Sequence, residues 1–257
     1  MRRRGFALLI VLWTLVPVSI LFLTLAGVAR SDSHLTFNLR NAAKLQAAAD
    51  GGINSALFGL LRAPTATAPL KLRLGDAVVA VRIISLAGLV NPNTATADLL
   101  RALLQRVGAD PAQAVRIAAA IADWRTPGQA AQLAGLKTAA YRAAGLDYGP
   151  PGAPFESLAE LRDVLGMTPA LYDALLPALT LFTDRPPEPA FAPPIVRAAL
   201  SDLGIPARSG EGGNVFRIIA EAAGPDGSRA ERSAVIRFGP SPTGRPWTIL
   251  DWVTGPQ

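Results

Sequence analysis

The sequence contains no cysteine and a single histidine, His34. Without cysteine the chain can form no disulfide, no thiolate nucleophile and no cysteine-ligated metal centre. One histidine cannot supply a multi-histidine zinc site, and we interpret His34 as a solvated residue just outside an apolar segment. The sequence also lacks a glycine-rich phosphate loop, a Gly-x-Ser-x-Gly motif and side chains at metal-ligand spacing. These absences argue against an enzyme.

Positively charged residues are in modest excess. The 257 residues carry a formal net charge of +6. Arg2, Arg3 and Arg4 contribute three of these charges, so removal of the N-terminal peptide would halve the excess. The basic balance is therefore weak evidence for nucleic-acid binding.

The sequence does contain an uncharged apolar run from Phe6 to Ala29, directly after the arginines. A membrane-spanning helix needs about 20 such residues. Three interpretations compete: a secretory signal peptide cleaved after Ala29, a signal anchor with cytoplasmic arginines, and a pilin-type leader cleaved between Gly5 and Phe6. The run is longer than the roughly 7–15 apolar residues of a signal peptide, which disfavours the first interpretation.

The residues after this run indicate that the helix continues. Residues 30–62 contain no proline, and their apolar residues recur at helical spacing. These residues are Leu35, Leu39, Ala42, Leu45, Ala49, Ile53, Leu57 and Leu60. Pro17 should kink the helix rather than end it, so about 55 residues would form a rod of roughly 80 Å. A membrane helix that continues as an amphipathic helix favours the pilin-type leader.

Strand patterns flank a helical block. Alternating residues at 70–84 predict a hairpin with its turn at Gly75-Asp76. Residues 215–223 and 229–238 predict a second hairpin, and 245–253 a last strand. Either the helical block is inserted into one sheet, or it lies between two separate hairpins. Insertion is favoured because an isolated two-stranded hairpin is marginally stable.

The helical block shows several helix-start signals. Thr94 or Thr96 is predicted to cap a first helix, and Asp110-Pro111 starts a second. A capping box from Ser157 to Glu160 predicts another helix, and Thr168-Pro169 opens the next. A short helix is predicted at 195–204.

Six motifs occur in order along nearly the whole chain. They are RGFALLIVLW, QAAADGGINSALFGLL, VNPNTA, AAAIADW, PFESLAELRDVLGM and YDALLPALTLF. In this order they resemble the K-type minor pseudopilins of the type II secretion system (general secretion pathway protein K). The resemblance implies an α+β, pilin-like fold, with a long N-terminal helix and a small antiparallel sheet that carries an inserted all-helical domain of sterile-alpha-motif (SAM)-like type. The implied ranges are a leader at 1–5, the long helix at 6–62, sheet parts at 63–90 and 205–257, and the helical domain at 91–204.

The same resemblance implies a non-enzymatic subunit at the tip of the pseudopilus, which initiates or caps the assembly and supports protein export. Its implied partners are the I-, J- and H-type minor pseudopilins, the major G-type pseudopilin and the prepilin peptidase, with no nucleic acid. The peptidase would cleave after Gly5, and Phe6 would become N-methylated. The implied location is the bacterial inner membrane, crossed once, with the C-terminal domain in the periplasm.

Ile10 departs from the usual pilin pattern. With Phe6 as the first mature residue, Ile10 occupies the fifth position, where most pilins have a glutamate that pairs with the terminal amine of the next subunit. A carboxylate in the bilayer costs several kcal/mol unless it is paired. A subunit with no neighbour ahead of it has no such amine, so Ile10 favours the tip of the pseudopilus. The alternative is that Ile10 is one more lipid-facing residue of a signal anchor.

K-type proteins can bind calcium through acidic residues after an Asp-Trp motif. Here Asp123-Trp124 is followed by Thr126, Gly128, Gln129 and Ala130, and Asp147 is the one acid between Asp123 and Glu156. Calcium needs about 6–8 oxygen ligands. We therefore predict no metal ligand and no cofactor.

Two other functions stay open. One is a minor pilin of a type IV system. The other is a membrane-anchored helical-hairpin DNA-binding protein, because VNPNTA and helical hairpins recur in DNA-uptake proteins. The turns here, VGADP and LGMTP, lack the paired glycines and lysines that contact phosphates.

Overall fold

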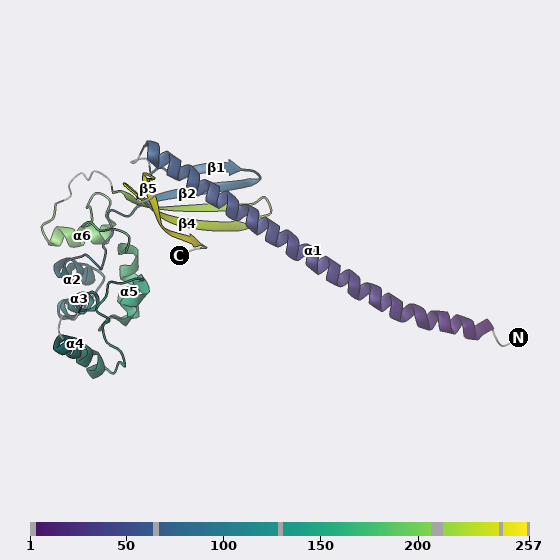
Figure 1. Cartoon of the computed structure of the whole chain (residues 1–257), viewed down its shortest axis with the longest axis horizontal. Coiled ribbons are helices and arrows are strands. Elements are labelled where there is room, and N and C mark those ends of the chain that lie inside the picture. The colour runs from purple at the N-terminus through teal and green to yellow at the C-terminus, as the bar shows by residue number, and fades with distance from the viewer. Residues whose placement is uncertain (1–3, 64–66, 128–130, 207–212, 242–243, 256–257) are drawn as a thin grey trace.

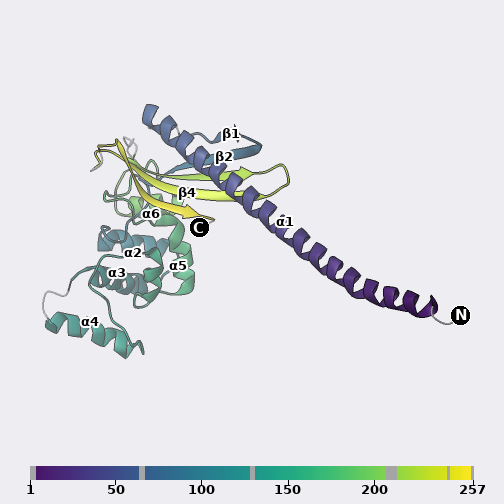
Figure 2. The same cartoon turned by 45° about the vertical axis from the view of Figure 1, so that its right-hand side comes forward.

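A long helix packs on a five-stranded sheet, and shorter helices gather at the end of the sheet remote from the helix's free end (Figures 1 and 2). The computed structural model describes residues 4–63, 67–127, 131–206, 213–241 and 244–255. Within these ranges, residues 4–10, 14, 21–37 and 131–136 are described by their backbone alone.

The long helix, α1 (Arg4–Arg62), has 59 residues and continues through Pro17. The prediction of one uninterrupted helix is therefore confirmed. Its last third packs on the sheet through side chains that recur every three or four residues and so share one face. The buried members of this face are Leu45, Ala48, Ala49, Ile53, Ala56, Leu57 and Leu60.

Of the α1 glycines whose surroundings are described, Gly52 lies closest to the sheet. A Cβ atom at Gly52 would lie 2.7 Å from Val79 Cγ1 and 3.1 Å from Val81 Cγ2. Real Cβ atoms essentially never approach to less than 3.0 Å, so a side chain here would force the helix or the sheet to move. Gly59, about two turns further along α1, has nothing within 4 Å of the same position.

The sheet is antiparallel throughout and its strand order follows the sequence. Its strands are β1 (Leu70–Leu74), β2 (Ala77–Ser85), β3 (Val215–Ala223), β4 (Arg229–Phe238) and β5 (Trp247–Thr254). Both predicted hairpins are present, and pairs such as Val81↔Ala220 join them into one sheet. The chain thus leaves the sheet after Ser85 and returns to it at Val215.

The segment between β2 and β3 is helical. It contains α2 (Ala97–Arg106), α3 (Pro111–Arg125), α4 (Ala131–Ala143), the 3-10 helices η1 (Leu158–Asp163) and η2 (Leu176–Ala178), α5 (Pro169–Leu175) and α6 (Pro194–Asp202). Its SAM-like character and the limits 91 and 204 stay predictions.

Helix caps match the sequence at three places. The side chains of Thr96, Asp110 and Thr168 each accept a hydrogen bond from a backbone N–H in the first turn of α2, α3 and α5. Two details differ from the predictions. The capping box of Ser157 and Glu160 starts a 3-10 helix and not an α-helix. This helix ends after six residues, where the backbone becomes extended at Val164. No helix was predicted where α4 lies, although its alanines favour helix without apolar periodicity.

Hydrophobic residues form two large cores. One fills the space between α1 and the sheet, and the other fills the helical segment around Leu103, Ile117 and Ile121. A small third cluster of Leu86, Val215 and Val235 lies between them. Arg237 also donates from Nη2 to the carbonyl of Phe182 at 2.8 Å, which ties β4 to the helical segment.

Candidate assembly surface

The part of α1 that extends beyond the sheet exposes apolar side chains. None of the side chains described before Leu45 is buried. Seven apolar residues near the free end are each between 54% and 75% exposed: Val11, Leu12, Trp13, Leu15, Val16, Val18 and Ile20. An exposed apolar surface of this extent marks an interaction site.

The residues singled out in the sequence lie at the start of this helix. Gly5, Phe6 and Ile10 belong to the first turns of α1, and their side chains lie outside the described part of the chain. Their roles in processing and at the tip stay predictions. The predicted span, Phe6 to Ala29, also lies in large part outside the described side chains. Among those that are described, no helix is long and apolar enough to cross a membrane.

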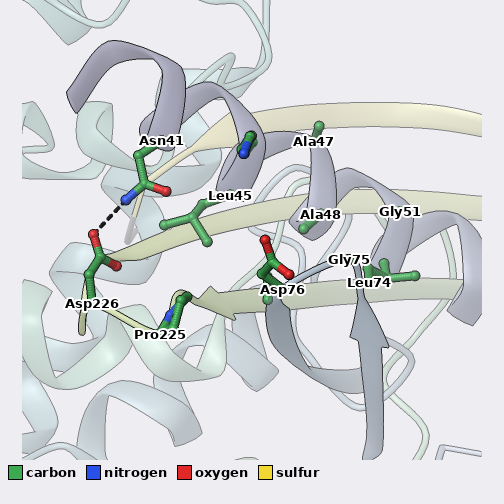
Figure 3. A pocket seen from close by; sticks show the side chains of 12 residues that line it. Asn41, Leu45, Ala47, Ala48, Gly51, Leu74, Gly75, Asp76, Pro225 and Asp226 are labelled. Carbon is green, nitrogen blue, oxygen red and sulfur yellow. Dashed lines mark hydrogen bonds between the residues drawn. The ribbon is translucent and has the colours of Figure 1, made fainter. Parts of the chain in front are cut away.

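A groove of about 750 Å³ opens where α1 passes the ends of two hairpins (Figure 3). One wall is α1, from Asn41 to Gly51, and the other is formed by the β1–β2 and β3–β4 turns. The lining residues are Asn41, Lys44, Leu45, Ala47, Ala48, Gly51, Leu74, Gly75, Asp76, Ala77, Pro225 and Asp226. No local sequence pattern indicates this groove, because its two walls are far apart along the chain.

Polar contacts close one end of the groove. Asn41 Nδ2 donates to Asp226 Oδ2 at 2.7 Å and to Ser228 Oγ at 2.9 Å, and the first bond is drawn in Figure 3. The pKa of Asp226 lies below its ordinary value, chiefly because the Ser228 hydroxyl donates to the carboxylate and stabilises its charge. The β3–β4 turn is thereby attached to α1.

An ion pair supports the same packing further along α1. Arg232 Nε on β4 lies 3.2 Å from Asp50 Oδ1, and the two side chains are 17% and 34% exposed. The pair is less screened by solvent than an exposed one, so it helps to fix the position of α1 over β4.

The VNPNTA motif has its side chains engaged inside the helical segment. Asn91 is buried and donates from Nδ2 to the carbonyl of Thr183, while its Oδ1 accepts from Asn93 N at 2.9 Å. Asn93 donates to the carbonyl of Phe155 at 2.9 Å and accepts from Phe155 N at 2.8 Å. These amides join residues that lie 62 and 92 positions apart in the sequence.

Arg125 completes this arrangement from the end of α3. Its Nη2 donates to the carbonyl of Ala95 at 2.7 Å, and its Nη1 to the carbonyl of Pro92. Burial lowers the pKa of Arg125. The motif and Arg125 thus help to hold the helical segment together.

The described residues around Asp123-Trp124 show how its side chains are used. In the part of the chain whose side chains are described, no three acidic or histidine side chains gather to hold a metal. The carboxylate of Asp123 faces the ammonium of Lys137, with Oδ1 3.2 Å from Nζ. Trp124 next to it is buried and stacks on Phe155 with ring centroids 5.7 Å apart. The Asp123 carboxylate is thus paired with a cation of the chain itself, and the absence of a metal ligand stays a prediction.

Comparisons with known proteins agree on one family. The family model for type II secretion system (T2SS), protein K matches residues 35–184. Type II secretion system protein K of Klebsiella pneumoniae is 32% identical over 89 residues, which cover 35% of this chain and 27% of that protein. The chain thus spans about a quarter of the length of this curated relative.

A solved structure shares the fold. One chain of the crystal structure of the GspK-GspI-GspJ complex from the type 2 secretion system of enterotoxigenic Escherichia coli matches over its whole length and over 89% of this chain. The TM-score is 0.64 at 18% sequence identity. At this identity the likeness shows a common fold.

Proposed function

The chain belongs to the protein K family of the type II secretion system, the K-type minor pseudopilins, and on this premise we propose that it is a non-enzymatic subunit at the tip of the pseudopilus. There it assembles with other minor pseudopilins to initiate or cap the pseudopilus and so supports protein export.

The exposed apolar surface of α1 carries this proposal. A helix anchored to its own sheet from Leu45 onward, with apolar side chains such as Trp13 uncovered at the other end, is suited to lie in a membrane or beside the helices of other subunits. Catalysis requires a pocket lined by reactive side chains, whereas an exposed apolar surface is suited to bind another apolar surface.

The I- and J-type pseudopilins are the first partners we propose. A structure with the same fold as this chain was solved from a complex that contains GspK, GspI and GspJ. We extend the proposal to the H-type and the major G-type pseudopilins, which would meet the same helix in the assembled pseudopilus.

Processing is proposed at the start of α1. The prepilin peptidase would cleave between Gly5 and Phe6, and Phe6 would be N-methylated. The mature chain would keep its apolar helix as a single pass through the inner membrane, with the sheet and the helical segment in the periplasm. Ile10 would then be the fifth mature residue, with no carboxylate to pair with a neighbour's amine, which suits a subunit at the tip.

Mass spectrometry of the mature amino terminus tests the pilin-type processing. The protein would be purified from the membranes of cells that contain the prepilin peptidase. We expect the chain to begin with N-methylated Phe6, because cleavage after Gly5 leaves the apolar helix intact. A mature chain that begins at Met1 or Arg30 would contradict the proposal.

Co-assembly tests the position in the pseudopilus. The full chain in detergent should co-purify with the I and J subunits, and an Ile10→Glu variant should be recovered in smaller amounts, because its carboxylate lacks a partner amine. Ile10→Ala is the control and should assemble as the wild type does. Equal recovery of Ile10→Glu would argue against the tip, and association with type IV pilins instead would favour a minor pilin of that system.

A further inference from the structure

Three oxygen atoms surround the ammonium of Lys137. Lys137 Nζ lies 3.2 Å from the carbonyl oxygen of Asp123, 3.2 Å from its carboxylate Oδ1 and 3.4 Å from the carbonyl oxygen of Thr126. The lysine lies on α4, while the oxygen atoms belong to the last turn of α3 and the residue that follows it. The Lys137 side chain is 19% exposed and that of Asp123 is 52% exposed, so the stem of the lysine is largely covered.

A positive charge is favourable at the C-terminal end of α3. Carbonyl groups in the last turn of a helix have no partner within the helix and carry the negative end of its dipole. The carbonyl of Asp123 lies in this turn, and the Asp123 carboxylate adds a full negative charge beside it. A cation there would be stabilised by charge and by direct bonds to oxygen.

The choice of lysine fits three converging acceptors. The chain has only three lysines among its 25 basic residues, at positions 44, 71 and 137. An ammonium is a compact charge with three donors that can point to three separate oxygen atoms. A guanidinium presents its donors in one plane and cannot meet the same three oxygen atoms equally well.

We propose that the Lys137 ammonium is a built-in cation, which joins the end of α3 to α4 and makes the helical segment independent of calcium. A free metal ion would have to displace this ammonium and would then find one carboxylate and two carbonyl groups, far fewer than the roughly 6–8 oxygen ligands of a calcium site. The inference concerns how the helical segment is held together, and it stands whether or not the chain sits at a tip.

Thermal unfolding of the full chain in detergent micelles tests the proposal. The wild type should unfold at the same temperature in excess EDTA and in calcium at about 5 mM, which exceeds the roughly 1 mM of the weakest calcium sites. Lys137→Met keeps most of the length of the side chain and removes its charge. Its Tm should fall by about 3–8 °C, because the end of α3 loses its hydrogen bonds to a charged donor.

Two further variants separate this role from a general effect of charge. Lys71→Met removes an exposed lysine on β1 and should leave Tm unchanged. Lys137→Arg keeps the charge but not the geometry, so its Tm should lie between those of the wild type and Lys137→Met. If Lys137→Met cannot be purified, the arginine variant and the calcium titration of the wild type still decide.

Either of two results would overturn the proposal. A wild-type Tm that rises by more than about 2 °C in calcium would show that the segment holds a metal ion despite Lys137. A Tm of Lys137→Met equal to that of the wild type would show that the ammonium contributes nothing to the segment, and a Tm of Lys137→Arg equal to that of the wild type would show that its geometry with three oxygen atoms is not required.

Discussion

Among single residues, Asn93 connects parts of the helical segment that are distant in the sequence. Its amide pairs with both backbone groups of Phe155, as donor to the carbonyl and as acceptor from the N–H. Phe155 in turn stacks on Trp124 at the end of α3. The amide therefore fixes the aromatic packing of the core by satisfying a backbone that has no regular partner there.

Asn93→Asp tests this role. A carboxylate can still accept from Phe155 N, but it cannot donate to the carbonyl of Phe155 and would repel it. We expect the free energy of unfolding to fall by about 1–3 kcal/mol, as for a partly buried carbonyl acceptor left without its donor. Chemical denaturation would measure this, with the exposed Asn38→Asp as a control that should change little. A loss no larger than that of the control would contradict the role of Asn93.

The roles of some of these residues could be predicted from the sequence, and those of others could not. Thr96, Asp110 and Thr168 were predictable as caps because each bonds a backbone group three residues away. Asn91 and Asn93 stood out within a motif, but their partners come from distant positions that no local pattern identifies. Lys137 gave no signal at all, since its three oxygen partners meet only when α3 and α4 are in place.

Among the elements, α1 depends on the absence of a side chain at one position. Gly52 lies against β2 and β3, where an added Cβ would be 2.7 Å from Val79 Cγ1 and 3.3 Å from Ala220 Cβ. Val79 and Ala220 are fully buried, so they have little room to give way. The helix can lie this close to the sheet because the residue is glycine.

Gly52→Ala and Gly59→Ala form a matched pair on the same helix. Overpacking at Gly52 should lower the free energy of unfolding by about 1–3 kcal/mol, whereas Gly59→Ala should raise it by about 0.5–1 kcal/mol because alanine is the better helix former. Denaturation of both variants would measure the two changes. If both substitutions stabilise the protein, α1 does not lie as close to the sheet as described.

Elements were predictable where periodicity was strong. All five strands were predicted, β1, β2 and β4 from alternation, and helical spacing predicted the second half of α1. The alanine-rich sequence of α4 favours a helix but has no periodic apolar face. Periodicity therefore does not predict this helix. The pairing of β2 with β3 joins residues more than 130 positions apart and could be argued only from the instability of a lone hairpin.

For the molecule as a whole, the two large hydrophobic cores are separate, and a small cluster of apolar residues connects them. The core under α1 and the core of the helical segment each bury their own set of apolar residues, and Leu86, Val215 and Val235 lie between them. Parts with separate cores and few shared contacts commonly unfold as separate units.

Hydrogen exchange along a denaturant series should therefore show two transitions. Gly52→Ala should shift the transition of α1 and the sheet, and Asn93→Asp that of the helical segment, with each leaving the other in place. The double variant should show the two shifts added together, within about 0.5 kcal/mol. A single transition that both substitutions displace equally would show that the small contact makes the molecule one cooperative unit.

The fixed end of α1 makes the rest of the helix a lever. Its first 40 residues or so extend over roughly 60 Å at 1.5 Å per residue, and their direction follows from how the buried face of α1 packs on the sheet, with Asn41–Asp226 and Asp50–Arg232 at its edge. A rotation of about 5° in this packing would carry the far end through about 5 Å, which is one turn of a helix. A small change where α1 meets the sheet would therefore change the angle between the sheet and whatever binds the far end of the helix.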